Sequence, residues 1–326
     1  MQNRTMGFVI SHKNSEKRRG LLPEDLGRIR NVDSLCFETG YGESVNIGDE
    51  EFLKAGAHVV SREEALKCDV IVDVKLGDAD YLDQLDDGKT LVGWAHAVQG
   101  LDFASTCLNK NFTVIAWEEI YEQGQYIFHR NREVAGEAGV MQAFLYCGKM
   151  PYDCKVAILG NGKTAKGAMR ILHGLGAEVD VYGRKLEKLF IERMGDYDVL
   201  INCIMWDTNR TDRIIYREDL KKLKKGCMII DISCDPGLEI ETSRATTIQD
   251  PVYTVDGVIH YEVDNTPAMF PITVTKILSN AFAGYVDGIL EGDVPASIEK
   301  ATVIKNGHIM DENITKFRER RGLFCK

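Results

Sequence analysis

Short runs of apolar residues alternate along the chain with longer stretches in which apolar residues recur at helical spacing. Runs of this length are typical of strands buried in a parallel sheet, and the stretches between them are typical of the helices that connect such strands. The pattern therefore predicts an α/β fold. Strands are expected at residues 6–11, 69–74, 90–93, 112–117, 155–159, 178–182, 198–204, 227–232 and 258–263.

The chain of 326 residues is expected to form two domains, because one domain commonly contains about 100–200 residues. A polar stretch at 121–130 interrupts the alternation of strands and helices, and a long helical pattern at 268–290 follows the last strand. The remaining tail is too short to be a domain, so we expect it to return to the first half. The prediction is two Rossmann-like domains with a cleft between them: a doubly wound parallel-sheet domain over 131–274, and a discontinuous domain over 1–130 and 275–326.

Composition and charge narrow the classes of partner. Hydrophobic residues make up 44% of the chain and charged residues 28%, which is ordinary for a globular protein. The net charge is −10, so we expect neither nucleic acid nor a membrane as a partner. The nine cysteines are scattered without a Cys-x-x-Cys pair, which argues against a disulfide framework or a zinc ribbon. Free thiols and the absence of a signal-peptide pattern favour the cytoplasm.

The glycine-rich segment 160–165 is the strongest candidate for a binding site. It lies between the predicted strand 155–159 and a predicted helix at 164–172, and its form G-x-G-x-x-A matches the dinucleotide-binding fingerprint in the place where that fingerprint occurs. The first glycine permits a tight turn, the second lets the backbone approach a pyrophosphate, and the alanine lets helix and strand pack closely. The predicted cofactor contacts are Gly160, Asn161, Gly162, Lys163, Thr164 and Ala165.

The end of the next strand predicts which dinucleotide binds. NAD enzymes commonly place an acidic residue there to bind the ribose 2′-hydroxyl. This strand instead ends at Gly183, followed by Arg184 and Lys185. Two cations without an adjacent acid favour the 2′-phosphate of NADP(H), and both side chains are predicted to contact it. Asp180 is the competing candidate for a ribose-binding acid, although it lies inside the strand rather than at its tip.

Ionisable residues also follow several predicted strands of the first half. A loop at 17–19 (KRR) follows the first strand, and Lys75 comes directly after the strand DVIVDV. His96 ends the segment GWAH, and Glu118 and Glu119 end the strand FTVIAW. Ligands of parallel α/β sheets gather at strand carboxyl ends, so these residues are expected to converge. Taken singly, each has an ordinary interpretation as a solvated loop, a structural histidine or a helix-start acid.

Eight segments, in order, carry a family resemblance: 17–23 (KRRGLLP), 93–96 (GWAH), 135–139 (AGEAG), 155–162 (KVAILGNG), 182–185 (YGRK), 197–202 (YDVLIN), 223–235 (LKKGCMIIDISCD) and 264–267 (DNTP). Over nearly its full length the chain resembles the alanine dehydrogenase / transhydrogenase / saccharopine dehydrogenase superfamily. Within it, the resemblance is to synthases that reductively condense pyruvate with the side-chain amine of ornithine or lysine, using NADPH. It also implies a homo-oligomer.

The resemblance implies catalytic roles for individual residues. Arg18, five residues before Pro23, matches the arginine that binds the substrate carboxylate, with Arg19 as the alternative if the loop register shifts. Lys75 matches a lysine at the end of a strand, which supplies a positive charge near the carbonyl or carboxylate. His96 matches the acid–base histidine, a side-chain type that titrates near neutral pH.

Four further positions complete the predicted site. Asp235 matches the catalytic aspartate that follows the fourth Rossmann strand, and Asn265 matches an asparagine that faces cofactor and substrate. Arg132 occupies a position that approaches the cofactor phosphates in relatives. Cys203, at a strand end, is included among the cofactor contacts, with a buried structural thiol as the alternative.

Alternatives to the synthase hypothesis remain. An alanine dehydrogenase would use ammonia, but the polar loop 205–213 does not resemble the alanine dehydrogenase loop there. A saccharopine-type enzyme would use 2-oxoglutarate and would need a further cation. Synthases usually carry a tyrosine where this chain has Gly183, so the adenosine pocket is expected to differ. A non-catalytic nucleotide sensor is disfavoured by the four catalytic candidates occurring together.

Overall fold

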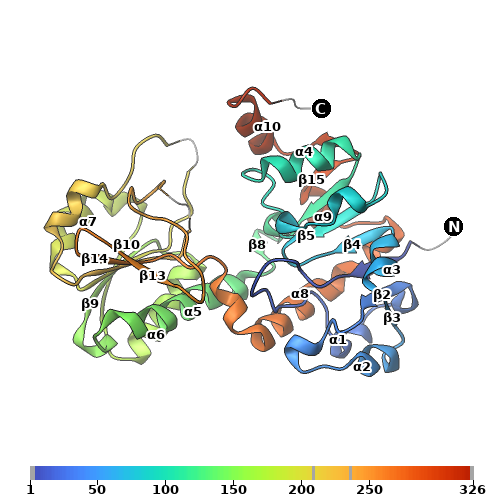
Figure 1. Ribbon diagram of the computed structural model, residues 1–326, viewed down its shortest axis with the longest axis horizontal. Helices are drawn as coiled ribbons and strands as arrows, with labels where there is room; N and C mark the ends of the chain where they lie inside the picture. The colour runs from blue at the N-terminus through green and yellow to red at the C-terminus, as the bar shows by residue number, and fades with distance from the viewer. Residues whose placement is uncertain (1–3, 208–209, 235–236, 324–326) are drawn as a thin grey trace. The chain divides into compact units, whose positions relative to one another are not determined.

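The computed structural model describes residues 4–207, 210–234 and 237–323 (Figure 1). The chain divides into two compact units. Unit 1 contains Met1–Phe128 with Pro271–Lys326, and unit 2 contains His129–Phe270. Both units are built on sheets with helices around them, which confirms the α/β fold class with two domains. Among the described residues, no helix combines the length and apolar character needed to cross a membrane.

Unit 1 contains an eight-stranded sheet in the order β16-β15-β6-β5-β4-β1-β2-β3. The strands from β6 to β3 in this order are parallel, whereas β15 pairs antiparallel with β6 and with β16. The strands are β1 (Met6–Phe8), β2 (Leu35–Glu38), β3 (His58–Val60), β4 (Val70–Val72), β5 (Thr90–Gly93), β6 (Thr113–Ala116), β15 (Thr302–Lys305) and β16 (His308–Ile309).

The strand order of this sheet reverses next to β1. The chain runs outward from β1 through β2 to β3, and then returns to lay β4 on the other side of β1. Ligands of open α/β sheets bind outside the carboxyl ends of the strands at such a reversal. The loops that follow β1 and β4 are therefore the place in unit 1 where a site is expected.

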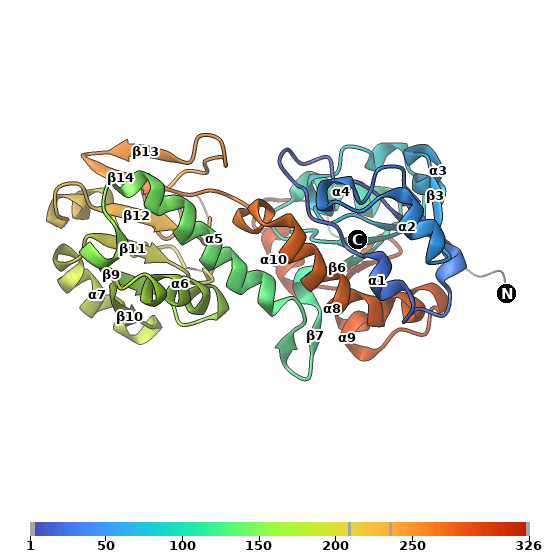
Figure 2. The same ribbon diagram turned by 90° about the horizontal axis from the view of Figure 1, so that it is seen from below.

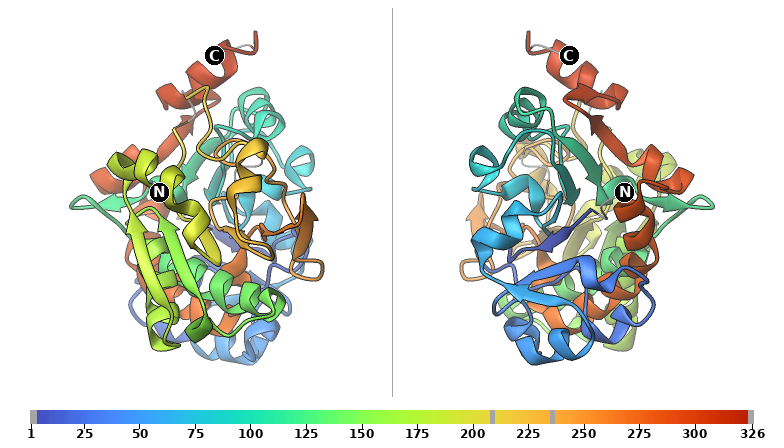
Figure 3. Two further views of the ribbon diagram at one scale, coloured as in Figure 1. Left: turned by 90° about the vertical axis from the view of Figure 1, so that its left-hand side faces the viewer. Right: turned by 90° about the vertical axis from the view of Figure 1, so that its right-hand side faces the viewer.

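Helices and two short strands surround this sheet. Every residue of β4 and β5 is buried, as expected for parallel strands covered on both faces. The last helix, drawn in red in Figures 1 and 3, is anchored by the buried Arg318, which donates to Leu101 O and Ser105 Oγ. The helices are α1 (Pro23–Leu26), α2 (Asp49–Lys54), α3 (Arg62–Lys67), α4 (Leu101–Asn109), α8 (Pro271–Glu291), α9 (Ala296–Lys300) and α10 (Glu312–Glu319), and the short hairpin strands are β7 (Tyr121–Glu122) and β8 (Gln125–Tyr126).

Unit 2 contains a six-stranded sheet in the order β10-β9-β11-β12-β14-β13, in which only the edge strand β13 is antiparallel (Figure 2). Its order reverses between β9 and β11, so the loops after these strands define the switch point of unit 2. The elements are α5 (His129–Cys147), β9 (Lys155–Leu159), α6 (Lys163–Gly174), β10 (Glu178–Tyr182), α7 (Glu187–Arg193), β11 (Val199–Asn202), β12 (Met228–Asp231), β13 (Val252–Val255) and β14 (Val258–Tyr261).

Helices α5 and α6 lie side by side and touch through glycines (Figure 2). A Cβ on Gly136 would lie 2.0 Å from Thr164 O, and one on Gly167 would lie 1.9 Å from Glu133 O. Neither position can carry a side chain without moving a helix backbone. This contact holds the first turn of α6, and with it the glycine-rich turn, against α5.

We expect Gly167→Ala to lower the free energy of unfolding by roughly 1–3 kcal/mol, because the added methyl group overpacks the α5–α6 contact. Gly174, in the last turn of the same helix, is the matched control, since its Cβ would meet no atom within 4 Å. Gly174→Ala should be neutral or stabilise by up to about 1 kcal/mol through helix propensity. Urea unfolding of both variants measures the difference, and equal effects would contradict the packing argument.

Candidate active site and cofactor site

The predicted catalytic residues of the first half lie on loops at one edge of the unit 1 sheet. β1, β4, β5 and β6 include the switch point and run parallel, so their carboxyl ends share this edge. Arg18 lies on the loop after β1, Lys75 follows β4 and His96 follows β5. Glu118 lies in the short helix Trp117–Glu119 that follows β6. The topology therefore brings these residues to the same side of one sheet.

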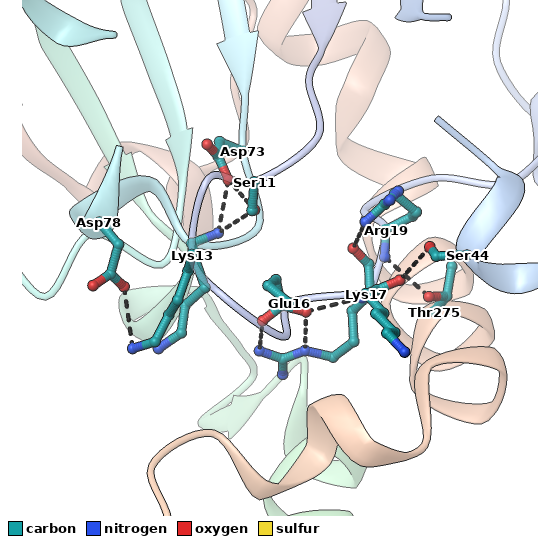
Figure 4. A network of polar contacts seen from close by, with 11 residues as sticks. Ser11, Lys13, Glu16, Lys17, Arg19, Ser44, Asp73, Asp78 and Thr275 are labelled. Atoms are coloured by element: carbon teal, nitrogen blue, oxygen red, sulfur yellow. Dashed lines mark hydrogen bonds and ion pairs between the residues drawn. The ribbon is translucent and has the colours of Figure 1, made fainter. Parts of the chain in front are cut away.

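Arg18 is held in a buried ion pair. Its side chain is 2% exposed and donates from Nε and Nη2 to the carboxylate oxygens of Glu16, at 2.9 and 2.6 Å. The backbone N–H of Arg18 donates to Glu16 as well, at 2.9 Å (Figure 4). The guanidinium carbon lies 4.6 Å from the ring centroid of Trp94. Glu16 compensates the buried charge and fixes the orientation of the guanidinium.

Arg19, the alternative candidate, is bound to the protein itself. Its Nε donates to Tyr41 O and its Nη1 donates to Arg18 O at 2.8 Å. Its backbone N–H donates to Thr275 Oγ1 at 2.9 Å (Figure 4). These contacts fix the loop, and both arginines are buried and bound within the protein.

The loop that carries Lys75 is fixed by a buried carboxylate. Asp73 accepts hydrogen bonds from the hydroxyl of Ser11 (Figure 4) and from the backbone N–H of Lys75, the latter at 2.9 Å. Its other carboxylate oxygen accepts from Tyr81 Oη at 3.0 Å. Burial raises the pKa of Asp73, and these hydrogen bonds oppose that rise. The Lys75 side chain is itself buried. A lysine in this position is held close to the end of its strand rather than extended into solvent.

His96 has an unusual backbone conformation and an exposed side chain. Its φ is +45°, in the left-handed region, where a residue with a side chain is uncommon. Its backbone N–H donates to Glu118 Oε1 at 2.6 Å, and its carbonyl accepts from the N–H of Gly100 at 2.9 Å. Backbone strain of this kind is found where the surrounding structure holds a functional side chain in place.

Glu118 joins the loop after β5 to the loop after β6. One carboxylate oxygen accepts from the N–H of His96 and the other from the N–H of Ala95, at 3.1 Å. Loss of surrounding water raises the pKa of Glu118 to about 7, against the smaller opposing effect of these hydrogen bonds. From the sequence, Glu118 was predicted to lie at a strand end, and no catalytic role was predicted for it. The structure thus gives Glu118, which binds the backbone N–H of His96, a pKa near neutral.

The glycine-rich turn of unit 2 lies at the switch point after β9. Gly160 has φ +104°, and a Cβ there would lie 2.8 Å from Cys203 O, so the fold itself requires this glycine. Gly162 differs, because a Cβ on it would meet no atom within 4 Å. Internal packing therefore does not require Gly162, and the open backbone leaves room for a pyrophosphate. The core side chain Ala165 is fully buried against the sheet.

The carboxylate of Glu133 forms ion pairs with three basic side chains next to this turn. Glu133 of α5 accepts from Lys163 Nζ at 3.2 Å, from Arg170 Nη2 at 3.1 Å and from Arg130 Nη1. Burial by itself raises the pKa of Glu133. Hydrogen bonds from Arg170, Lys163 and Arg130 outweigh this effect and lower the pKa to about 2. Glu133 was not predicted as a site residue, since nothing in the sequence pattern except the glycines of α5 places this helix against α6. Its charge restrains Lys163 beside the predicted phosphate site.

The predicted 2′-phosphate residues lie at the edge of a cavity of about 380 Å³. Arg184 lines the cavity, and Lys185 is exposed beside it. A Cβ on Gly183 would meet no atom within 4 Å. Asp180 lies elsewhere, because it accepts a hydrogen bond from Tyr197 Oη at 2.7 Å and lies 3.7 Å from Lys155 Nζ. These contacts disfavour Asp180 as a ribose-binding acid.

The remaining predicted residues belong to unit 2. Arg132 lies half-buried in the first turns of α5, and Asn265 has φ +67° before the short helix Thr266–Met269. The Cys203 thiol is buried in the core, so only the backbone of this residue faces the glycine turn. Asp235 lies outside the described residues. Within the described ranges, no group of three or more His, Cys, Asp or Glu side chains is placed to hold a metal ion.

Two family models match the chain. The N-terminal domain of the alanine dehydrogenase/PNT family matches residues 10–129, and its C-terminal domain matches residues 184–316. The N(5)-(carboxyethyl)ornithine synthase of Clostridium botulinum is 32% identical, over 86% of this chain and 93% of that protein. The chain belongs to the alanine dehydrogenase/PNT family.

Other members of the family agree with this assignment. Alanine dehydrogenase 1 of Staphylococcus aureus is 25% identical, over 93% of this chain and 92% of that protein. A solved structure of L-alanine dehydrogenase superposes with a TM-score of 0.82 at 21% identity, over 97% of this chain and 99% of that one. The superposition confirms the α/β fold with two domains. Membership in the alanine dehydrogenase/PNT family makes the chain an oxidoreductase that uses a nicotinamide cofactor.

The raised pKa of Glu118 gives a testable pH dependence. Below pH 4.5, the ordinary pKa of this group, the carboxyl is protonated in both the folded and the unfolded chain. Between pH 4.5 and about 7 the unfolded chain releases a proton that the folded chain retains, so wild-type stability falls across this window. Glu118→Gln removes the titration. We expect the variant to gain stability relative to wild type between pH 5 and pH 8.

Urea unfolding of both proteins at the two pH values measures this change. Glu119→Gln serves as the control, because Glu119 is the exposed neighbour in the same short helix. A stability difference between Glu118→Gln and wild type that does not change with pH would show that Glu118 titrates in its ordinary range.

Proposed function

We propose that the chain catalyses the NADPH-dependent reductive condensation of pyruvate with the side-chain amine of ornithine or lysine, forming an N-(1-carboxyethyl) amino acid. The observation that carries this proposal is the 32% identity to a relative named N(5)-(carboxyethyl)ornithine synthase, over 93% of that relative. In the reaction, pyruvate, the amine, NADPH and a proton give the condensed product, NADP⁺ and water.

In this proposal Arg18 binds the carboxylate of pyruvate. The pair with Glu16 and the stacking on Trp94 hold the Arg18 guanidinium in one orientation before substrate arrives. A planar guanidinium is suited to a carboxylate, and a preset orientation lowers the entropy cost of binding it. Lys75 adds a positive charge that polarises the carbonyl group, which favours attack by the amine.

His96 moves the proton in the condensation step. The amine nitrogen adds to the carbonyl carbon of pyruvate, and the carbinolamine then loses its hydroxyl group as water to give an imine. The departing hydroxyl needs a proton, which His96 supplies as a general acid. Glu118, whose pKa is about 7, binds the backbone N–H of His96 and positions it. Asp235 is proposed to orient the incoming ammonium group.

The residues of unit 2 fit the nicotinamide dinucleotide that the family uses. The open backbone at Gly162 and Gly183 leaves room for the pyrophosphate and for a group on the adenosine ribose. Arg184 and Lys185 supply positive charge for a 2′-phosphate, hence the choice of NADPH. Arg132, Lys163 and Asn265 are the other proposed contacts. When bound, the cofactor supplies the hydride that reduces the imine carbon.

In this proposal one domain binds the cofactor and the other binds the substrates. Residues 131–274 form the cofactor domain, and residues 1–130 with 275–326 form the substrate domain. The protein is proposed to act on small molecules as a homo-oligomer.

One assay tests the reaction directly. Purified protein is mixed with NADPH and pyruvate, and with ornithine, lysine or ammonia in parallel, while NADPH loss is followed and products are identified by mass. A carboxyethyl adduct of ornithine or lysine is the expected product. Alanine formed from ammonia alone would favour an alanine dehydrogenase, to which the 25% identity over 93% of the chain gives some support. Turnover with 2-oxoglutarate and lysine only would favour a saccharopine-type enzyme.

His96→Ala should reduce turnover by roughly 10²–10⁴, the usual cost of losing a general acid–base group. Pyruvate affinity should change little, because Arg18 and Lys75 remain. His58→Ala is the control, since His58 is an exposed histidine on β3 of the same sheet and should leave turnover unchanged. Steady-state kinetics with varied pyruvate separate the two parameters. Full turnover in His96→Ala would remove His96 from the mechanism.

A further inference from the structure

The cavity beside Arg184 holds more negative than positive charge. Three carboxylates and two guanidinium groups line it, and the charged lining residues are Arg184, Glu187, Asp207, Arg210 and Asp212. A 2′-phosphate carries up to two negative charges and would be repelled by uncompensated carboxylates. The proposed preference for NADPH is therefore favoured by any group of the protein that offsets this negative charge.

Arg210 offsets part of this negative charge, through ion pairs with two of the three carboxylates. Its Nη1 donates to both carboxylate oxygens of Glu187, at 3.0 and 3.1 Å. Its Nε and Nη2 donate to the two oxygens of Asp212, each at 2.9 Å. The guanidinium carbon lies 4.5 Å from the ring centroid of the buried Trp206, which sets the plane of the group.

Arg184 is placed differently. Its Nη2 donates to the carbonyl of Met205 at 3.4 Å, and among the described residues it makes no ion pair. Of the two guanidinium groups that line the cavity, that of Arg184 is therefore available to pair with an anionic ligand, whereas that of Arg210 is paired with Glu187 and Asp212.

Of the three carboxylates, Glu187 lies nearest in sequence to the strand end at Gly183, where NAD enzymes commonly place a ribose-binding acid. It begins α7, four residues after Gly183, and lines the same cavity as Arg184. A free carboxylate near the ribose repels a 2′-phosphate and accepts hydrogen bonds from ribose hydroxyls, which is how many enzymes select NAD(H). Arg210 holds both oxygens of Glu187 and so removes both effects.

We propose that Arg210 is a specificity-determining residue that favours NADPH over NADH by neutralising Glu187, not by binding the cofactor phosphate itself. The inference rests on the proposed function, since it explains how the adenosine end of the cofactor site accepts a 2′-phosphate. Arg210 is a positioning residue in this role. The residues that meet the phosphate remain Arg184 and Lys185.

The test is a cycle of variants read by cofactor binding. NADPH and NADH are titrated into the full chain without substrate, and binding is followed by nicotinamide fluorescence. Arg210→Gln frees Glu187 and should weaken NADPH binding roughly fivefold or more, while NADH binding is kept or strengthened. Retained NADH binding also shows that the variant is folded.

The double variant decides the mechanism. Adding Glu187→Gln to Arg210→Gln removes the freed carboxylate, so the ratio of NADPH to NADH affinity should return to within about twofold of wild type. Asp212→Asn is the control, because it keeps the Arg210–Glu187 pair and removes one negative charge, so the ratio of NADPH to NADH affinity should not fall below that of the wild type. Equal losses of NADPH binding in the single and double variants would overturn the inference, since Arg210 would then bind the phosphate itself. An unchanged ratio in Arg210→Gln would overturn it as well.

The proposal that the cofactor is NADPH is tested by the wild-type protein alone, separately from the role of Arg210. A wild-type protein that does not prefer NADPH contradicts the proposed cofactor, whatever the variants do. The inference is judged only by the change in the affinity ratio from one variant to the next, and that change does not depend on which cofactor the wild type prefers.

Discussion

Parallel pairing of strands is the constraint on which both sites depend. A parallel sheet brings the carboxyl ends of its strands to one edge, and a reversal of strand order opens that edge to a ligand. The chain uses this constraint twice, next to β1 in unit 1 and between β9 and β11 in unit 2. Residues as distant in sequence as Arg18 and Glu118 reach one edge for this reason alone.

Charge compensation is the second theme of the structure. A buried charge is costly without a partner, and three of the cations discussed above have a carboxylate beside them. Arg18 is paired with Glu16, Lys163 with Glu133, and Arg210 with Glu187 and Asp212. The carboxylates set how much positive charge each site presents to an anionic ligand.

The sequence predicted the central elements well and the peripheral ones poorly. Strands β5, β9 and β10 have the predicted bounds, and a glycine lies at or next to the end of each, which marks the turn. Strands β2 and β3 went unrecognised because they have only three or four residues and mix polar with apolar positions. β13 was also missed, although Asp256 and Gly257 form a two-residue turn of the kind that joins hairpin strands. Glu133 pairs with Lys163 and Arg170, which lie 30 and 37 residues away, so no local pattern encodes its role.

The hydrogen bonds from the loop after β1 to helix α8 have a consequence for synthesis of the chain. Arg19 and Leu22 donate their backbone N–H groups to the hydroxyls of Thr275 and Ser279. The ribosome makes these hydroxyls only after all of unit 2. Unit 2 is continuous in sequence and emerges whole, whereas the loop that orients Arg18 lacks its anchors until the final segment follows. Unit 2 is thus complete before unit 1.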